Sequence, residues 1–164
     1  MLAALLFSLS MYSCSAPPTA PIAGEKPQTV AADGITPSLM RSAAKPSYNL
    51  EKIGDVVNPF EKQPVTVSGS ETLTVAGWAV DAEHKGIPAG VEVVVDGKAY
   101  RAEAGQDRAD VAGHFKIPAY LKSGFTFSAP ASVFGPGKHV VAIRIIASDK
   151  KSYLEGLGVA VDIR

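Results

Sequence analysis

The chain has a single cysteine, a single tryptophan and no excess of charge of either sign. With Cys14 alone, no disulfide can form within the chain. Lysine and arginine together number 16, as do aspartate and glutamate, and the basic residues are scattered between apolar positions. Binding of nucleic acid needs a concentrated basic face, so the composition argues against a nucleic-acid partner.

Motifs of common enzyme chemistry are also missing. No serine lies in a nucleophile elbow, and no glycine-rich loop has the form that cradles phosphate. His84, His114 and His139 lie far apart, and none has a metal-ligand neighbour two or four residues further on, so we expect no metal and no cofactor. Asp107 and Asp110 could form a glycosidase pair, but nearby carboxylates in a polar segment are common. We therefore expect no enzyme, with a small hydrolase as an alternative.

Residues 1–13, MLAALLFSLSMYS, form an apolar, uncharged run. The run is too short to span a bilayer as a helix but has the length of a signal-peptide hydrophobic region. The basic segment that normally precedes such a region is missing, so either the true start lies upstream or the signal is atypical. The run ends at Cys14, and the segment 9–14 resembles a bacterial lipoprotein lipobox. Ser13 fits that pattern, whereas Met11 and Tyr12 do not.

The lipobox resemblance implies that Cys14 is lipidated and becomes the mature N-terminus. It further implies an extracytoplasmic protein, in the periplasm or at the cell surface, that is held to a membrane by lipid. In lipoprotein families an aspartate after the cysteine is associated with inner-membrane retention, and this chain has Ser15 instead, which favours the outer membrane. The alternatives are a plain secretory signal with an incidental cysteine and an anchor that is not cleaved.

The rest of the chain divides into two parts by composition. Residues 14–52 are rich in proline, alanine and serine and predict a flexible linker, with an ordered coil near Tyr48 and Leu50 as the alternative. Residues 53–164 alternate short apolar runs with turn residues, beginning with a first strand at 53–57. No segment with helical periodicity competes, so this part predicts an all-β domain, either a sandwich or a barrel.

Two hairpins are expected in the β domain. Asp96-Gly97 is a strong type I′ turn signal, because both central residues of that turn need a positive φ. The turn sets the cross-strand pairs, which are Val95 with Lys98, Val93 with Tyr100 and, as an exposed ion pair, Glu92 with Arg101. The last two strands should form a C-terminal hairpin with seven inward side chains, namely Val141, Ile143, Ile145, Leu157, Val159, Val161 and Ile163.

The segment 73–81, LTVAGWAVD, carries the tryptophan and a dense strand signal. Leu73 and Val75 share one face by the two-residue period, whereas Trp78 and Val80 would fall on the other. Glycine within a strand is typical of a bulge or of a close backbone approach. We therefore expect a bulge at Ala76–Gly77 that turns Trp78 into the core, as a structural residue.

Five short motifs occur in a fixed order: Gly77-Trp78-Ala79-Val80-Asp81, Val95-Asp96-Gly97, the Gly105–Val111 segment with Arg108 and Asp110, Gly124-Phe125, and Pro136-Gly137-Lys138-His139. Together they resemble a bacterial immunoglobulin-like β-sandwich module with the pattern GWA-x-D, V-D-G, G-x-x-R-x-D-V, G-F and P-G-x-H. The resemblance covers about residues 53–164. It implies an antiparallel immunoglobulin-like β-sandwich of a kind that serves as an accessory domain in envelope and secreted proteins, usually without catalysis.

The candidate site residues are Asp81, His84, Arg108 and Asp110. Asp81, Arg108 and Asp110 could form a ligand-gripping triad, but we favour charge-assisted hydrogen bonds that link loops. Asp81 and His84, with Glu83, could also line a calcium loop, although the carboxylates are few. We expect a binding module with a protein partner in the cell envelope. The alternative is a carbohydrate-binding module, whose sugar contacts would come from Tyr100, Tyr120 or Tyr153 if Trp78 is in the core.

Overall fold

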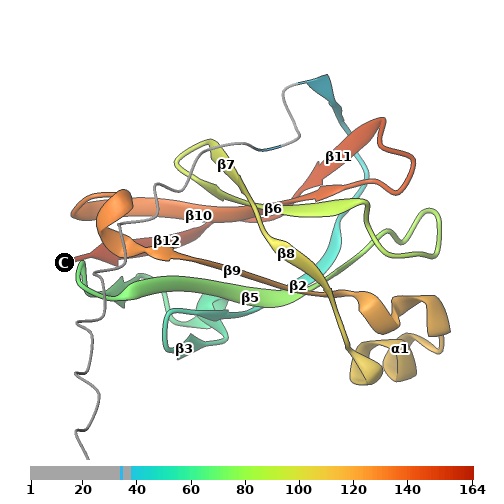
Figure 1. Ribbon diagram of the computed structural model, residues 1–164, viewed down its shortest axis with the longest axis horizontal. Coiled ribbons are helices and arrows are strands. Elements are labelled where there is room, and N and C mark those ends of the chain that lie inside the picture. The colour runs from blue at the N-terminus through green and yellow to red at the C-terminus, as the bar shows by residue number, and fades with distance from the viewer. Residues whose placement is uncertain (1–33, 35–37) are drawn as a thin grey trace, which may run out of the picture.

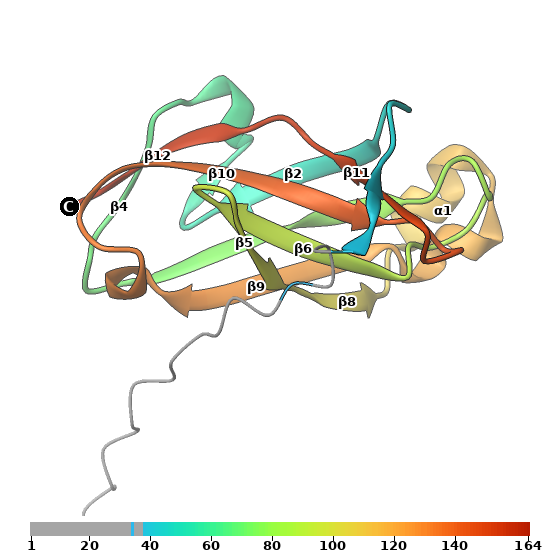
Figure 2. The same cartoon turned by 90° about the horizontal axis from the view of Figure 1, so that it is seen from above.

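The computed structural model describes Gly34 and residues 38–164, which fold as two β-sheets that face each other (Figure 1). The expected signal segment 1–13, Cys14 and most of the expected linker lie outside the described residues. Figure 2 shows the sandwich from above, with the C-terminus at one end and the helix α1, Ala109–Phe115, at the other. The expectation of a mostly β, two-layer domain is confirmed.

The first sheet is built around β10, Gly137–Ile146. One edge of β10 pairs with β6, Gly90–Val95, which in turn pairs with β7, Lys98–Arg101. Its other edge pairs with β11, Ser152–Glu155, and with β12, Val159–Ile163. Two short strands complete the sheet in parallel pairings: β1, Met40–Arg41, on β11 and β4, Val65–Val67, on β12.

The second sheet is antiparallel throughout, in the order β3, β2, β5, β9, β8. Its strands are β3 Val56–Val57, β2 Ser47–Ile53, β5 Thr72–Val80, β9 Gly124–Pro130 and β8 Glu103–Gln106. Short 3₁₀ helices lie between strands at η2 Pro59–Glu61, η3 Pro118–Lys122 and η4 Ala131–Val133.

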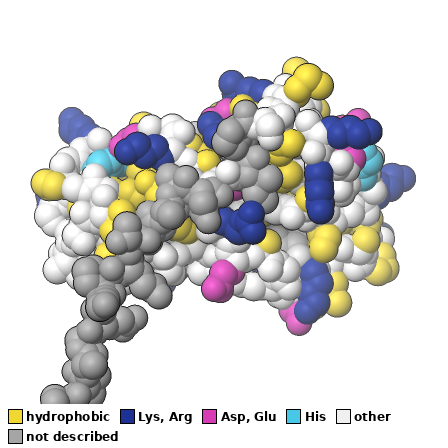
Figure 3. Space-filling model, turned by 45° about the horizontal axis from the view of Figure 1, so that its top comes forward, with side chains coloured by type: hydrophobic (Ala, Val, Ile, Leu, Met, Phe, Trp, Pro, Cys, Tyr) yellow, Lys and Arg dark blue, Asp and Glu magenta, His cyan; other side chains and the backbone are white. Residues whose placement is uncertain are grey.

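The hydrophobic core fills the space between the two sheets. Every second residue of a strand points into this core, because alternate side chains of a strand lie on the same face. The first sheet contributes, among others, Val91, Val93, Val141, Ile143, Ile145, Val159, Val161 and Ile163, and the second contributes Leu50, Ile53, Leu73, Val75, Phe125 and Phe127. On the face shown in Figure 3, the described hydrophobic side chains lie in several small groups among charged residues.

The Asp96-Gly97 hairpin forms in the predicted register. Asp96 and Gly97 have φ values of 50° and 83°, and Val95, Val93 and Glu92 lie opposite the three predicted partners. The expectation that Glu92 is exposed is wrong, because its exposed fraction is 0%. Gly34 lies against the Glu92 carboxylate on the outer face of this sheet, where a Cβ on Gly34 would be 3.0 Å from Glu92 Oε1.

The C-terminal strands pair antiparallel as predicted, but the second strand is interrupted. β11 and β12 are separate strands on the same edge of β10, and all of the predicted inward residues except Leu157 are buried. Leu157 lies between the two strands and is 74% exposed, so its inward assignment is wrong. The two-residue period cannot place a side chain where the chain leaves the sheet.

The bulge predicted at Ala76–Gly77 is wrong. β5 pairs with β9 without a shift from Thr72 to Trp78, and Leu73, Val75, Gly77 and Ala79 are all buried in regular alternation. Trp78 therefore points out of the sandwich instead of into its core. The irregularity lies on the neighbouring strand β2, whose register shifts between Leu50 and Lys52 opposite this stretch of β5.

The linker boundary at residue 52 is also wrong. β1 and β2 begin within the stretch expected to be a linker, and Leu50 in β2 is buried in the core. β2 also replaces the first strand expected at 53–57, since Gly54 and Asp55 form a turn between β2 and β3. β2 was not predicted because it follows a proline-rich stretch that ends at Pro46 and because its apolar residues do not alternate regularly.

One helical segment was not expected. The stretch after β8 forms α1 and then η3, and Arg108 stands at the N-cap position of α1. Val111 and Phe115 are four residues apart and face the same way on the helix. Together with Trp78, Val80 and Tyr120, this segment builds a second, smaller apolar cluster on the outer face of the second sheet.

Candidate functional site

The candidate site lies where α1 covers the outer face of β5. The Trp78 ring meets the Phe115 ring edge to face, with centroids 5.6 Å apart, and Phe115 makes similar contacts with His114 and Tyr120. Trp78 is half-buried and Phe115 is 37% exposed, so both rings are partly open to solvent. α1 is thus held to the sheet by aromatic packing that leaves an accessible edge.

Arg108 connects this helix to β2 through two carboxylates. Its Nε–H and one Nη2–H donate to the Asp110 Oδ1 and Oδ2 atoms at 2.9 and 2.6 Å. The Nη1–H and a second Nη2–H donate to the Glu51 Oε2 and Oε1 atoms at 2.9 and 2.8 Å. Four of the five guanidinium N–H groups are therefore used, and each of the four carboxylate oxygens accepts one of them.

The electrostatics of this cluster favour the charged forms of Asp110 and Arg108. Hydrogen bonding from the Arg108 guanidinium lowers the pKa of Asp110 to about 2. In return, hydrogen bonds to Asp110 and then to Glu51 raise the pKa of Arg108 above its usual value. Because two carboxylates face one guanidinium, the cluster carries one negative charge in excess.

A shallow pocket of about 280 Å³ lies between the ionic cluster and the aromatic rings. It is lined by Glu51, Trp78, Arg108, Asp110, Val111, His114 and Phe115. Sites for drug-sized ligands usually measure about 300–1,000 Å³. The pocket is therefore suited to one ring or one side chain of a larger ligand.

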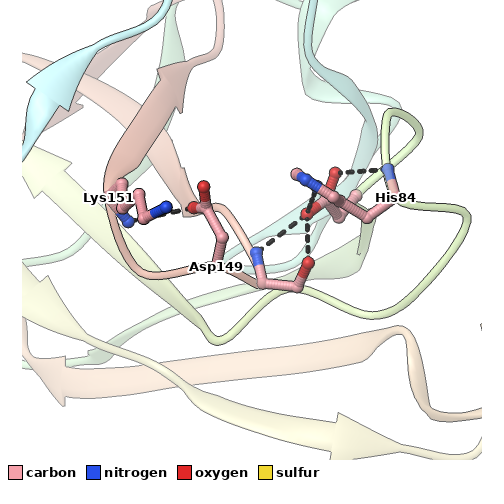
Figure 4. Close-up of polar contacts among 5 residues, drawn as sticks. His84, Asp149 and Lys151 are labelled. Carbon is pink, nitrogen blue, oxygen red and sulfur yellow. Dashed lines mark hydrogen bonds and ion pairs between the residues drawn. The ribbon is translucent and has the colours of Figure 1, made fainter.

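Asp81 forms a separate cluster at the ends of β5 and β10. Its side chain is 2% exposed and accepts hydrogen bonds from His84 N–H at 3.2 Å, Ser148 N–H at 2.8 Å and Ser148 Oγ–H at 2.8 Å. The His84 Nδ1 atom lies 2.8 Å from Asp81 Oδ2 (Figure 4). In the adjoining turn, Asp149 accepts a hydrogen bond from the Lys151 N–H.

The Asp81 contacts set the charge state of this cluster. Burial opposes ionisation of Asp81, but the hydrogen bonds from Ser148 and His84 outweigh it and hold the pKa of the carboxyl below its usual value. The bond to Asp81 raises the pKa of His84. Ser148 Oγ donates to the same carboxylate oxygen that faces His84, so the serine is not aimed at the imidazole as a nucleophile would be. The cluster joins the 81–90 loop to the 147–151 loop.

Asp96 has a similar joining role at the opposite end of β6. Its Oδ1 accepts the Val140 N–H at 2.9 Å, and its Oδ2 lies 2.6 Å from His139 Nδ1. His139 Nε2 lies 3.1 Å from the Gly135 carbonyl oxygen. Asp96 therefore has two roles in the hairpin: its backbone adopts the positive φ that the turn needs, and its carboxylate holds the turn against β10.

The four candidate residues thus belong to two clusters. Arg108 and Asp110 come together, as do Asp81 and His84, but Asp81 makes its contacts with His84 and Ser148 and not with Arg108. Asp107, the other half of the suggested glycosidase pair, bonds to Lys122 at 2.8 Å. Among the residues that the structure describes, no three His, Cys, Asp or Glu side chains are grouped so that they could hold a metal ion.

Sequence reasoning missed Glu51 and Phe115 as parts of the site. Glu51 was assigned to the linker and lies 57 residues from Arg108, so no local pattern joins the two. Phe115 could have been found, because its four-residue spacing from Val111 is typical of one face of a helix. Of the sugar-contact tyrosines, Tyr100 and Tyr120 are buried, whereas Tyr153 lies beneath the Arg144 guanidinium.

Comparisons with models of protein families, with curated proteins and with solved structures give no match to this chain. Within the described part of the chain, none of the helices combines the length and the apolar character needed to cross a bilayer.

Proposed function

We propose that the chain is a non-catalytic, immunoglobulin-like binding module that is tethered outside the cytoplasm and engages a protein partner in the cell envelope. The observation that carries this proposal is the pocket beside α1. It combines partly exposed aromatic rings with carboxylates fixed in place by Arg108, and preorganised polar groups next to aromatic surface are typical of binding sites.

The arrangement of the sheets supports the immunoglobulin-like assignment. Two facing sheets enclose one core, and most strand pairs are antiparallel. Two parallel pairings and the α1 segment between β8 and β9 are departures from the simple sandwich. Such an added segment at the end of a rigid sandwich is a usual place for function, because loops there can vary without disturbing the core.

The second candidate function is that of a carbohydrate-binding module, whose ligand would be an envelope or host glycan. The specific observation in its favour is that Trp78 lies on the outer face of β5, where an indole can contact a sugar ring, with the Glu51 and Asp110 carboxylates beside it. The contacts of Asp107 and Asp110 give no support to the hydrolase alternative. Asp107 pairs with Lys122 and Asp110 pairs with Arg108, so the two carboxylates do not act on a common point.

The membrane tether is tested at Cys14. The wild-type chain and a Cys14→Ser variant are expressed in a bacterium that is fed an alkyne-labelled fatty acid. We expect label and membrane partition for the wild type and neither for the variant. Equal membrane partition of the two chains would contradict lipid tethering and favour an uncleaved anchor.

The protein partner is tested by crosslinking in intact envelopes followed by pull-down of the full chain. A single partner recovered in near-stoichiometric amount supports a protein-interaction module. Saturable binding to a glycan array, with no protein recovered, would support the carbohydrate-binding alternative instead.

A further inference from the structure

The pocket beside α1 offers hydrogen-bond acceptors in the carboxylates of Glu51 and Asp110, and its possible donors are Arg108, the Trp78 indole N–H and the His114 ring. Arg108 is its strongest donor group, and four of its five N–H groups are already bonded to Glu51 and Asp110. The Glu51 carboxylate keeps unused lone pairs, since an ionised carboxylate has about four acceptor sites and each oxygen accepts only one bond from Arg108. The Asp110 carboxylate accepts the same two bonds from Arg108 and also faces the backbone N–H groups of Asp110 and Val111. A ligand that uses these carboxylate lone pairs must therefore bring donors.

The charge and the rings of the pocket favour a cation among donor-rich ligands. The cluster has one negative charge in excess, and the Trp78 and Phe115 rings line the same pocket. Cations are attracted both to carboxylates and to the faces of aromatic rings. A neutral sugar would use the acceptors but would gain nothing from the charge.

The bonding pattern further distinguishes an ammonium from a guanidinium. A guanidinium binds a carboxylate best as a fork that takes both oxygens in parallel, and Arg108 already occupies both oxygens of Glu51 and of Asp110 in this way. An ammonium is a compact charge with three rotatable donors, so it can use single lone pairs on two separate carboxylates.

We propose that this pocket binds a lysine side chain presented by the partner protein, with the ammonium against Glu51 and Asp110 and the aliphatic stem along Trp78 and Phe115. The inference rests on the proposed function as a protein-binding module and names the anchor that such a partner supplies. The pocket volume of about 280 Å³ is suited to a single side chain.

The single tryptophan makes the site directly observable, because all indole fluorescence of the chain comes from Trp78. The full-length chain in detergent is titrated with Nα-acetyl-lysine methylamide, while Trp78 emission is followed. Nα-acetyl-norleucine methylamide lacks the ammonium and tests whether the charge is needed. Nα-acetyl-arginine methylamide tests whether a guanidinium binds more weakly than an ammonium. Glucosamine and glucose test the alternative that the pocket binds a sugar. We expect a saturable response to the lysine probe and none to the norleucine probe.

Two variants locate the binding. Asp110→Asn should weaken binding of the lysine probe about two- to fivefold, the range of a partly exposed ion pair. Asp107→Asn is the matched control, because it removes the same charge three residues away from a side chain that is equally exposed, at 67% against 66%, and lies outside the pocket lining. Phe115→Leu keeps apolar packing but removes a ring, and should weaken binding by a similar factor.

Several results would overturn the inference. These are equal affinity for the lysine and norleucine probes, stronger binding of the arginine probe, a response to glucose, or equal effects of Asp110→Asn and Asp107→Asn. If Asp110→Asn does not fold, Phe115→Leu decides alone. The pull-down separates the two proposals. A partner recovered in equal amounts by the wild type and by Asp110→Asn leaves the protein-binding function intact and removes the lysine anchor. Saturable binding of the lysine probe without a recoverable partner leaves the lysine site intact and removes the proposed protein-binding function.

Discussion

Gly77 offers the sharpest test of how the second sheet is built. A Cβ at this position would overlap the Asn49 carbonyl oxygen and lie 3.1 Å from the Asn49 carbonyl carbon and 3.3 Å from the Glu51 nitrogen. All three atoms belong to the backbone of β2, so none can rotate away as a side chain would. Gly77→Ala must therefore move the strand, at a cost of about 3 kcal/mol, the upper end of the usual range for overpacking.

The assay for Gly77→Ala is urea unfolding together with thermal melting, where about 3 kcal/mol corresponds to a decrease in Tm of roughly 10 °C. Gly113→Ala is the matched control. Gly113 lies within α1 with no atom within 4 Å of an added Cβ, so the same substitution should stabilise the protein by about 0.5–1 kcal/mol. A Gly77→Ala protein within about 0.5 kcal/mol of wild type, or shifts of the same sign for both variants, would refute the close approach of β2 to β5.

Three further predictions concern the charged clusters. Asp81→Asn should cost about 2–3 kcal/mol in urea unfolding, because a buried carboxylate with bonds to His84 and Ser148 is replaced by a neutral group; a loss below about 0.5 kcal/mol would contradict this role. The pKa of Asp110 is lowered to about 2, so its contribution is present above the ordinary carboxyl pKa near 4 and should be lost as pH falls from about 4 to about 2. Asp110→Asn should reduce this acid dependence, and an unchanged profile would count against the pairing with Arg108. The pKa of His84 is raised, so its contribution is complete below the ordinary histidine pKa of about 6.5 and should be lost as pH rises through the raised value. His84→Gln should flatten the dependence of the unfolding free energy on pH above about 6.5, and a slope equal to wild type would rule this out.

Local signals in the sequence were enough to predict the hairpin at Asp96-Gly97. Turn type and register follow from two adjacent residues that both accept a positive φ, and no distant contact is needed to choose between alternatives. The sequence did not predict that the Asp96 carboxylate also binds Val140 and faces His139. Those contacts join residues more than forty positions apart, and only the packing of β6 on β10 brings them together.

α1 shows where local reasoning was incomplete. The seven residues ADVAGHF contain a glycine and are too short to form a stable helix alone, so the strand signals on either side prevailed. The helix is stabilised by tertiary contacts, chiefly the packing of Phe115 against Trp78 and Tyr120. Those contacts require Trp78 to lie on the outer face, which the expectation of a core tryptophan had excluded.

The glycine in the tryptophan strand led to the wrong prediction of a bulge in β5, because the irregularity belongs to the partner strand β2. Leu50 and Ile53 both point into the core although they are three residues apart, which is possible because the β2 register shifts at Glu51. Gly77 has no Cβ and leaves room for the displaced β2 backbone, so β5 keeps its regular alternation. The shift also lets Glu51 meet Arg108 on the side where Trp78 emerges. A bulge in β5 would have buried the tryptophan, whereas the bulge in β2 brings a carboxylate beside it and thereby creates the pocket.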